Sequence, residues 1–211
     1  GNATGETNGK VYGVVAGNSK YIDVNKDGKI NTEDQGIIGC GQPTFNWGWN
    51  NTFNYKNFDF SFFVVGFHGF DIYNATHQMG YNLIKSQQMA GVTPMRELLN
   101  RWTPTNTNTD IPGFVKGGTE NKDFFSTRFV ENGSFIKMKS ITLGYTLPEA
   151  TCRSLGINNL RVYASVQNPF HITKYSGLDP EATMGSPLVQ GVDWGAYPNS
   201  RNYLIGLNFS F

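Results

Sequence analysis

Oxygen-bearing side chains close to the start of the chain are spaced as in a metal-binding loop. Residues 23–34 read DVNKDGKINTED, with acidic or amide side chains at alternate positions and a glycine where the loop must turn sharply. Twelve-residue calcium loops use this spacing, and their seventh residue contributes a backbone carbonyl oxygen. The sequence therefore predicts a calcium ion bound by Asp23, Asn25, Asp27, the Lys29 carbonyl and Asp34.

Two features distinguish this loop from that of a calcium sensor. Its last position holds Asp34 in place of the usual bidentate Glu, with Glu33 one residue too early, so we expect looser coordination. Glycines interrupt both flanks, and β-branched and aromatic residues dominate the second, which indicates strands and turns rather than the two helices of an EF-hand. We therefore expect an isolated calcium loop in a β protein. An Asx-rich turn stabilised by its own side-chain hydrogen bonds is the alternative.

The composition favours strands and a large aromatic surface. The 211 residues include 16 Phe, 10 Tyr and 25 Gly, and only 16% are charged, against ~25% in an average soluble domain. Such a chain suits turns, strands and exposed or lipid-facing aromatic side chains. The net charge of +1 and the lack of a basic cluster exclude nucleic-acid binding.

The sequence contains no pattern typical of an enzyme. His68, His77 and His171 are scattered without catalytic or metal-ligand spacing, and no nucleophile or phosphate-binding motif occurs. We therefore predict no catalytic or cofactor-binding residue. Cys40 and Cys152 lack the spacing of a zinc or redox site, and we expect them not to be bonded to each other.

Hydropathy excludes one class of membrane protein and leaves another open. The chain has no run of ~20 apolar residues, so it has no helical membrane span. A β-barrel remains possible, because its strands show only alternating polarity. The opening residues, GNATGETNGK, are polar and do not form a signal peptide, so a membrane protein with this sequence would be a mature product or a fragment.

Regular alternation of bulky and small or polar residues predicts five strands. Lys56 and Asn57 separate the first two, which indicates a tight hairpin. The stretch FIKMKS before the third strand has the opposite parity, which a bulge near Lys139 and Ser140 would reconcile. The predicted strands cover residues 44–55, 58–67, 141–147, 160–168 and 201–211.

Two further features favour a membrane barrel over a soluble β-sandwich, which alternates in the same way. Aromatic residues gather near the strand ends, and the strand lengths are close to the ~9–11 residues that cross a bilayer when tilted. The connections also alternate between short turns and long loops, as in outer-membrane barrels. On this reading the lipid-facing residues are Phe45, Trp47, Trp49, Phe60, Phe62, Leu143, Tyr145, Val162, Ile205, Leu207 and Phe209, and the alternate residues face the lumen.

Six stretches of the chain resemble those of a known family. The stretches YIDVNKDGKINTEDQGIIG, TFNWGWNNTFNYKNFDFSFFVVGFHGFDIYN, NRWTPTNTNTDIPG, FIKMKSITLGYTLP, LRVYASVQNPFHITKYSGLDPE and YPNSRNYLIGLNFSF occur in this order. Together they resemble the C-terminal part of the SusC-like (SusC/RagA-type) TonB-dependent outer-membrane transporters of Bacteroidetes. The resemblance implies an all-β fold: a transmembrane antiparallel β-barrel segment with long extracellular loops, formed by the last five strands of a 22-stranded barrel.

The resemblance also implies a function and partners. The whole transporter would import glycans or peptides with energy from TonB, under a SusD-like surface lipoprotein as lid. This chain would contact the remainder of the barrel and plug, outer-membrane lipid, and the oligosaccharide or peptide substrate. A soluble calcium-stabilised β-sandwich that serves in binding or adhesion is the alternative function.

The implied topology divides the chain into six segments. Residues 1–43 form an extracellular loop with the calcium-type motif, 44–69 a strand hairpin, 70–127 a long extracellular loop, 128–172 two strands with a periplasmic connection, 173–200 an extracellular loop and 201–211 the final strand.

Two features of the long loops remain open at the level of sequence. Residues 95–102 have the spacing of a short amphipathic helix, and we expect this helix to pack within its loop. Aromatic loop residues could stack on sugars, with none of them favoured over the others: Tyr81, Phe114, Phe124, Phe125 and Tyr197.

Overall fold

The computed structural model describes most of the chain and separates into two compact units. One unit is Gly1–Ile38 with Asn74–Val130, and the other is Gly39–Tyr73 with Glu131–Phe211. The described residues are 4–7, 10–13, 17, 19, 21–81, 94–113, 126–183 and 189–211.

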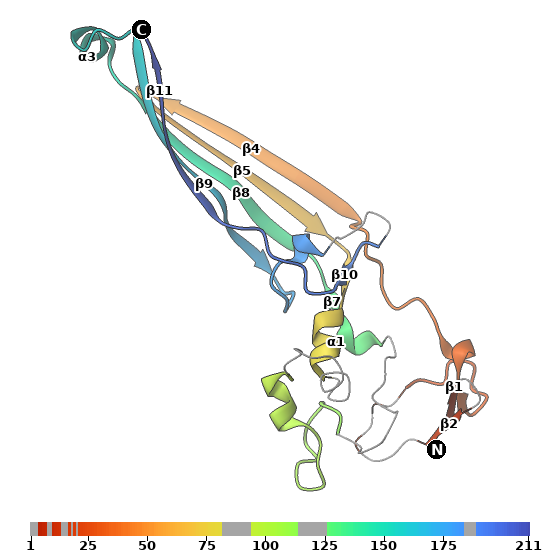
Figure 1. Ribbon diagram of the computed structural model, residues 1–211. Helices are drawn as coiled ribbons and strands as arrows, with labels where there is room; N and C mark the ends of the chain where they lie inside the picture. The colour runs from red at the N-terminus through yellow and green to blue at the C-terminus, as the bar shows by residue number, and fades with distance from the viewer. Residues whose placement is uncertain are drawn as a thin grey trace. The chain divides into compact units, whose positions relative to one another are not determined.

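A five-stranded antiparallel sheet dominates the second unit. Each strand pairs with the long strand that precedes or follows it in the chain, so the order across the sheet is β11-β9-β8-β5-β4 (Figure 1). All five predicted strands are confirmed, and three of them are longer than expected. The strands are β4 (Phe45–Tyr55), β5 (Phe58–His68), β8 (Phe135–Thr146), β9 (Asn159–Thr173) and β11 (Asn202–Ser210).

Short connections close one end of this sheet, which we call the turn end. Lys56 adopts a left-handed backbone (φ 51) in the predicted hairpin between β4 and β5. The next residue, Asn57, bonds to the end of β8: its carbonyl accepts from the Thr146 N–H at 2.8 Å, and its side chain donates to the Thr146 carbonyl at 2.8 Å. The tip of the hairpin is therefore tied to a third strand.

A short helix, α3 (Glu149–Ser154), occupies the connection between β8 and β9, where the sequence indicated only a linker. It lies at the turn end together with the C-terminus (Figure 1), and the Asn158 N–H donates to the Ser210 carbonyl at 2.8 Å. Cys152 is buried in this helix, whereas Cys40 is exposed and precedes β4 at the opposite end. Both cysteines are free, in agreement with the prediction that they are not bonded to each other.

The predicted bulge is also confirmed. Relative to β5, Phe63 pairs with Ser140 and the next residue, Val64, pairs with Met138, so Lys139 is an extra residue of β8. The pairing of β8 with β9 shifts at the same place. This insertion allows the apolar side chains on both sides of the bulge to share one face of the sheet.

Smaller elements lie around the long loops. A sheet of β6 (Asp71–Asn74), β7 (Val130–Asn132) and β10 (Val192–Asp193) has the order β10-β6-β7. In the first unit, β1 (Thr4–Thr7), β2 (Lys10–Gly13) and β3 (Lys29–Ile30) form a sheet of order β2-β1-β3. The remaining elements are α1 (Ala75–Tyr81) and the 3-10 helices η1 (Thr32–Asp34), η2 (Arg96–Asn100), η3 (Thr127–Phe129) and η4 (Pro180–Ala182).

The segment predicted as a short amphipathic helix differs from that expectation. It forms the 3-10 helix η2, in which Leu98 is buried but Leu99 is 80% exposed. The four apolar residues of the segment, Met95, Leu98, Leu99 and Trp102, thus do not share one buried side, since a 3-10 helix has three residues per turn rather than 3.6. Within the described residues, no helix is long and apolar enough to cross a membrane.

Candidate functional site

The five-stranded sheet has one face that is almost entirely apolar. Residues directly opposite each other on antiparallel strands point to the same side, so the register defines each face. Phe60 of β5 pairs with Phe53 of β4 and with Leu143 of β8, and Leu143 pairs with Ala164 of β9. Ala164 in turn pairs with Ile205 of β11. Every residue predicted to face lipid lies on this side of the sheet.

Most of the apolar face is open to the surroundings. Several of its large side chains are more than half exposed, and Ile205 is 84% exposed. Aromatic rings pack on one another along it, for example Trp49 on Phe62, with ring centroids 5.2 Å apart, and Phe58 on Tyr145 at 4.7 Å. An apolar patch of this extent marks a surface for a partner or a lipid phase.

The opposite face is polar over the turn-end half of the sheet. Thr142 pairs with Ser61 of β5 and Ser165 of β9, and the Thr142 and Ser165 hydroxyls are 2.8 Å apart. Asn50 and Asn54 project from β4 on this side. Such hydroxyls and amides need water or other hydrogen-bonding groups around them, so this face suits an aqueous environment.

An ion pair crosses three strands of the polar face. Arg161 of β9 donates from Nε to Asp59 Oδ1 at 2.9 Å and from Nη2 to Asp59 Oδ2 at 2.5 Å, and Asp59 belongs to β5. Gly144 of the intervening strand β8 lies directly beneath, and a Cβ atom there would collide with both side chains. The bidentate geometry therefore depends on a glycine at this position.

At the end of the sheet opposite the turn end, which we call the loop end, other segments of the chain cover the polar face. Val65 and Phe135, which point to this side, form a buried cluster with Ile72 of β6 and with Phe70 and Tyr175 from the adjoining loops. The Tyr175 hydroxyl donates to Asp193 Oδ2 at 2.5 Å within the same region. This end of the face is thus a packed core rather than an open surface.

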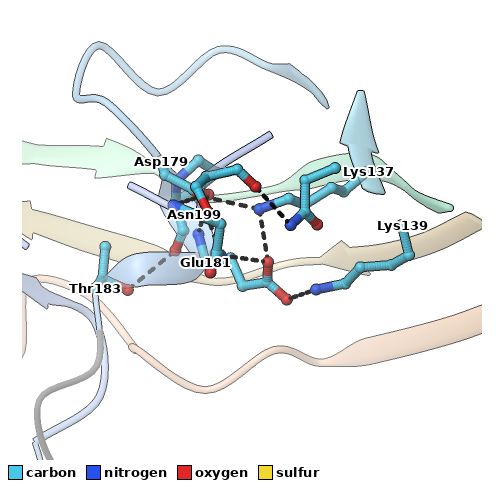
Figure 2. A network of polar contacts seen from close by, with 9 residues as sticks. Lys137, Lys139, Asp179, Glu181, Thr183 and Asn199 are labelled. Carbon is cyan, nitrogen blue, oxygen red and sulfur yellow. Dashed lines mark hydrogen bonds and ion pairs between the residues drawn. The ribbon is translucent and has the colours of Figure 1, made fainter. Parts of the chain in front are cut away.

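A polar network beside this cluster joins the segment after β9 to β8 (Figure 2). Lys137, only 2% exposed, donates to Asp179 Oδ2 at 2.9 Å and to Glu181 Oε2 at 2.7 Å. The bulge residue Lys139 forms an ion pair with the other oxygen of Glu181. The Asn199 side chain donates to the same two carboxylates, at 3.2 Å and 2.9 Å.

The network has balanced charges and controls the protonation of its acids. Burial is the largest single influence and raises the pKa of Asp179 and Glu181, but the hydrogen bonds and the lysine charges around them together outweigh it, and both pKa values lie below their ordinary values. Both acids are therefore ionised at neutral pH and match the charges of Lys137 and Lys139. We refer to these four residues and Asn199 as the Lys137 network.

The loop of residues 23–34 is tightly wound by its own side chains. The Asp27 N–H donates to Asn25 Oδ1 at 3.0 Å, and the Gly28 N–H donates to Asp23 Oδ2 at 2.8 Å. Asp34 accepts from the Asn31 N–H at 2.8 Å, and this bond contributes most to holding its pKa below the ordinary value. These Asx-type bonds agree with both readings of the sequence, a calcium loop or a turn.

The metal-ligand prediction is not tested by this geometry. In the part of the chain that the structure describes, no group of three or more His, Cys, Asp or Glu residues is positioned to hold a metal ion. The predicted set draws on three carboxylates, Asp23, Asp27 and Asp34, together with the Asn25 amide and the Lys29 carbonyl. The hard oxygen donors fit calcium in type.

The aromatic loop residues fall into separate environments. Tyr81 packs edge-on against His77, with ring centroids 4.7 Å apart, and its hydroxyl donates to Glu97 at 3.1 Å. Burial raises the pKa of Tyr81 to about 12, with a smaller contribution from Glu97. Tyr197 is 89% exposed. Phe114, Phe124 and Phe125 lie outside the described residues.

Comparison with known proteins connects this sheet to one class. No family model matches the chain. Its match to TonB-dependent receptor P3 of Formosa agariphila is 36% identical over 201 residues, and the matched region covers 92% of this chain and 19% of the receptor. It is 32% identical over 193 residues to TonB-dependent receptor SusC of Bacteroides thetaiotaomicron, covering 90% of this chain and 17% of SusC. The chain thus spans about a fifth of the length of these relatives.

Solved structures agree with the sequence relatives. The structure of the RagAB peptide transporter matches with a TM-score of 0.65 and 28% identity over 78% of this chain and 17% of that one. The RagAB peptide importer in its "closed-closed" state matches with a TM-score of 0.70 and 25% identity, over 98% and 20% of the two chains. The fold is therefore all-β and corresponds to part of a TonB-dependent transporter.

Within that class, the predicted resemblance to the SusC-like TonB-dependent transporters is confirmed. The relatives are named as receptors and importers, which confirms the expectation that the chain is not an enzyme. Sequence reasoning did not single out the Lys137 network. The only signal for it was a pair of lysines flanking an apolar residue in a strand, near a bulge.

Proposed function

We propose that this chain is one sector of the barrel of an outer-membrane transporter that imports glycans or peptides. TonB would supply the energy through the N-terminal part of the transporter, and a SusD-like lipoprotein would form the lid. The observation that carries the proposal is the division of the sheet into an exposed apolar face and a polar face, in a chain similar to TonB-dependent receptors.

The apolar face has the properties required of a barrel exterior. In lipid, every backbone N–H and C=O group must find a partner within the protein, and barrels achieve this by closing on themselves. The outer strands β4 and β11 each pair along one side only within the described residues. Further strands of the transporter would complete both edges and leave the apolar side chains against hydrocarbon.

The polar face would line the lumen. Its hydroxyl and amide groups, such as Thr142, Ser165 and Asn50, can exchange hydrogen bonds with water, with a plug or with a polar solute. Peptides and glycans are both rich in hydrogen-bonding groups. The RagAB structures are those of a peptide importer, which supports peptides as one substrate class.

A calcium-stabilised β-sandwich is the second candidate. A sandwich buries the inner faces of two sheets against each other. In the described residues, the largest sheet instead leaves its apolar face exposed, which favours the barrel. We further propose that the loop of residues 23–34 binds calcium through Asp23, Asn25, Asp27, Lys29 and Asp34. Bound calcium would hold the loop in one conformation, and the ion takes no part in transport.

Cell fractionation and uptake test the transporter. The parent gene would be expressed with an epitope tag, membranes would be separated by density, and uptake of labelled peptide and oligosaccharide mixtures would be compared with a deletion strain. We expect the protein in the outer-membrane fraction, extractable only with detergent, and loss of uptake of one mixture on deletion. Recovery in the soluble fraction would support the sandwich instead.

A further inference from the structure

The segment after β9 folds back over the polar face instead of projecting away from the sheet. We call residues 174–183 the strap. Its Tyr175 side chain packs in the cluster with Val65 and Phe135, both of which point to the polar side. Its Asp179 and Glu181 side chains bond to Lys137, which lies on the same side between Val65 and His171.

Of the two lysines in the Lys137 network, Lys137 is shielded from water and Lys139 is not. Its side chain is 2% exposed and that of its partner Asp179 is 3% exposed, whereas Lys139 is 30% exposed. A buried ammonium group without its carboxylate partners is strongly destabilising. Lys137 can therefore remain charged in this buried position only while the strap is docked over it and supplies the carboxylates.

A second link ties the strap to the residues just before the final strand. The Asn199 N–H and side-chain amide both donate to Asp179 Oδ2, at 3.1 Å and 3.2 Å. Asp179 also caps η4 by accepting from the Glu181 N–H at 3.0 Å. Figure 2 shows these groups converging from the strap, β8 and the segment before β11.

A third link lies at the start of the strap. The Ser176 N–H and hydroxyl donate to the two oxygens of Glu131 at 2.8 Å and 2.7 Å. The strap is thus held by apolar packing, by an ion-pair network and by hydrogen bonds. Opening the strap would expose aromatic side chains to water and leave buried charges without their partners. The strap is therefore a fixed part of the inner surface of the sheet.

We propose that the Lys137 network is a latch that keeps the strap on the inner wall of the barrel and shields this part of the polar face from solutes in the lumen. The proposal rests on the proposed function, in which the polar face lines the transport path. Lys137 acts as a positioning residue, because it touches the strap and not the solute. The passage is then narrower at the loop end than the sheet alone would make it.

Thiol accessibility beneath the strap tests the latch. Val65→Cys places a small side chain in the covered cluster, in a Cys40→Ser background that removes the exposed native thiol. The full-length protein in membranes would be treated with a membrane-impermeant maleimide. Labelling should be slow with the latch intact and at least about tenfold faster with Lys137→Met.

Lys139→Met is the matched control. It removes a lysine two residues away that contacts only Glu181 within the network and is partly exposed, so the labelling rate should remain within about threefold of the parent. Asp179→Asn, which keeps Lys137 in place, provides a second disruption if Lys137→Met fails to reach the membrane, and should also accelerate labelling. Unchanged labelling in the disrupted proteins would overturn the latch. Its readout is independent of uptake, so failure of the transport proposal would be recognised separately.

Discussion

An arginine introduced on the apolar face of the final strand should lower stability strongly, whereas an arginine introduced on the polar face should not. Ile205 and Leu204 are adjacent aliphatic residues of β11. Ile205 pairs with Ala164 on the apolar face and is 84% exposed, whereas Leu204 pairs with Ser165 on the polar face and is 45% exposed. Arg at either position changes size and charge equally, so only the environment differs.

The magnitude follows from the position of these residues along the strand. β11 has 9 residues, and Gly206 is its midpoint. With a rise of ~3.4 Å per residue and a tilt of ~40°, Ile205 lies only about 2.5 Å from the middle of the membrane. A lipid-facing Arg at this depth costs ~2–4 kcal/mol, which corresponds to a roughly 30-fold to 900-fold change in the folding equilibrium. A lumen-facing Arg at Leu204 keeps its hydration and should cost less than about 1 kcal/mol.

Denaturant titration of the full-length protein in lipid vesicles measures the difference. Folding would be followed by tryptophan fluorescence and by the mobility of the folded barrel on cold gels. We expect a clearly lower midpoint for Ile205→Arg and a midpoint near that of the parent for Leu204→Arg. Equal shifts in the two proteins, or a larger shift for Leu204→Arg, would refute the assignment of the faces.

Three further outcomes are expected. Gly144→Ala should lower the free energy of unfolding by about 1–3 kcal/mol, because its Cβ would collide with the ion pair above it, whereas Gly36→Ala, with open space around the added atom, should stay within about 0.5 kcal/mol in the same titration. Calcium titration calorimetry should show binding to the parent that Asp27→Ala abolishes, and identical responses would leave only an Asx turn. Because the network lowers the pKa of Asp179, its contribution to strap docking should be complete above pH ~4, the range of a free carboxyl group, and lost as pH falls through the lowered value. Amide exchange at Glu181, corrected for its intrinsic rate, should therefore accelerate only in acid, and a rate that is the same at neutral pH and at the lowest pH at which the barrel stays folded would contradict this.

The sheet was predictable because its signals are local. Side chains alternate with a period of two, so any strand with one apolar face shows it in a short stretch of sequence. The hairpin at Lys56 and Asn57 and the bulge at Lys139 could be predicted in the same way, since each interrupts or inverts that alternation. The helix α3 was missed because a six-residue helix shows too little periodicity.

The calcium-type loop shows how far spacing alone can go. The order of its oxygen-bearing residues predicted the turn, and Gly28 has the left-handed backbone (φ 83) expected at the sharp bend. The same side-chain oxygens accept backbone N–H groups in the structure. Spacing defines which donors are available to a metal ion, whereas affinity depends on how they converge in three dimensions.

Sequence alternation was sufficient for the strands and their two faces, and six ordered stretches of sequence were sufficient for the family resemblance, since both can be read along the chain. Only the tertiary structure brought Lys137 together with Asp179, which is 42 residues away, and placed Gly144 beneath an ion pair whose members are 102 residues apart. Neither contact leaves a periodic pattern, because each depends on how loops and strands fold onto one another. From sequence alone, a lysine in a strand is interpreted as a polar residue facing the lumen. Only the folded position of the strap shows that Lys137 is buried.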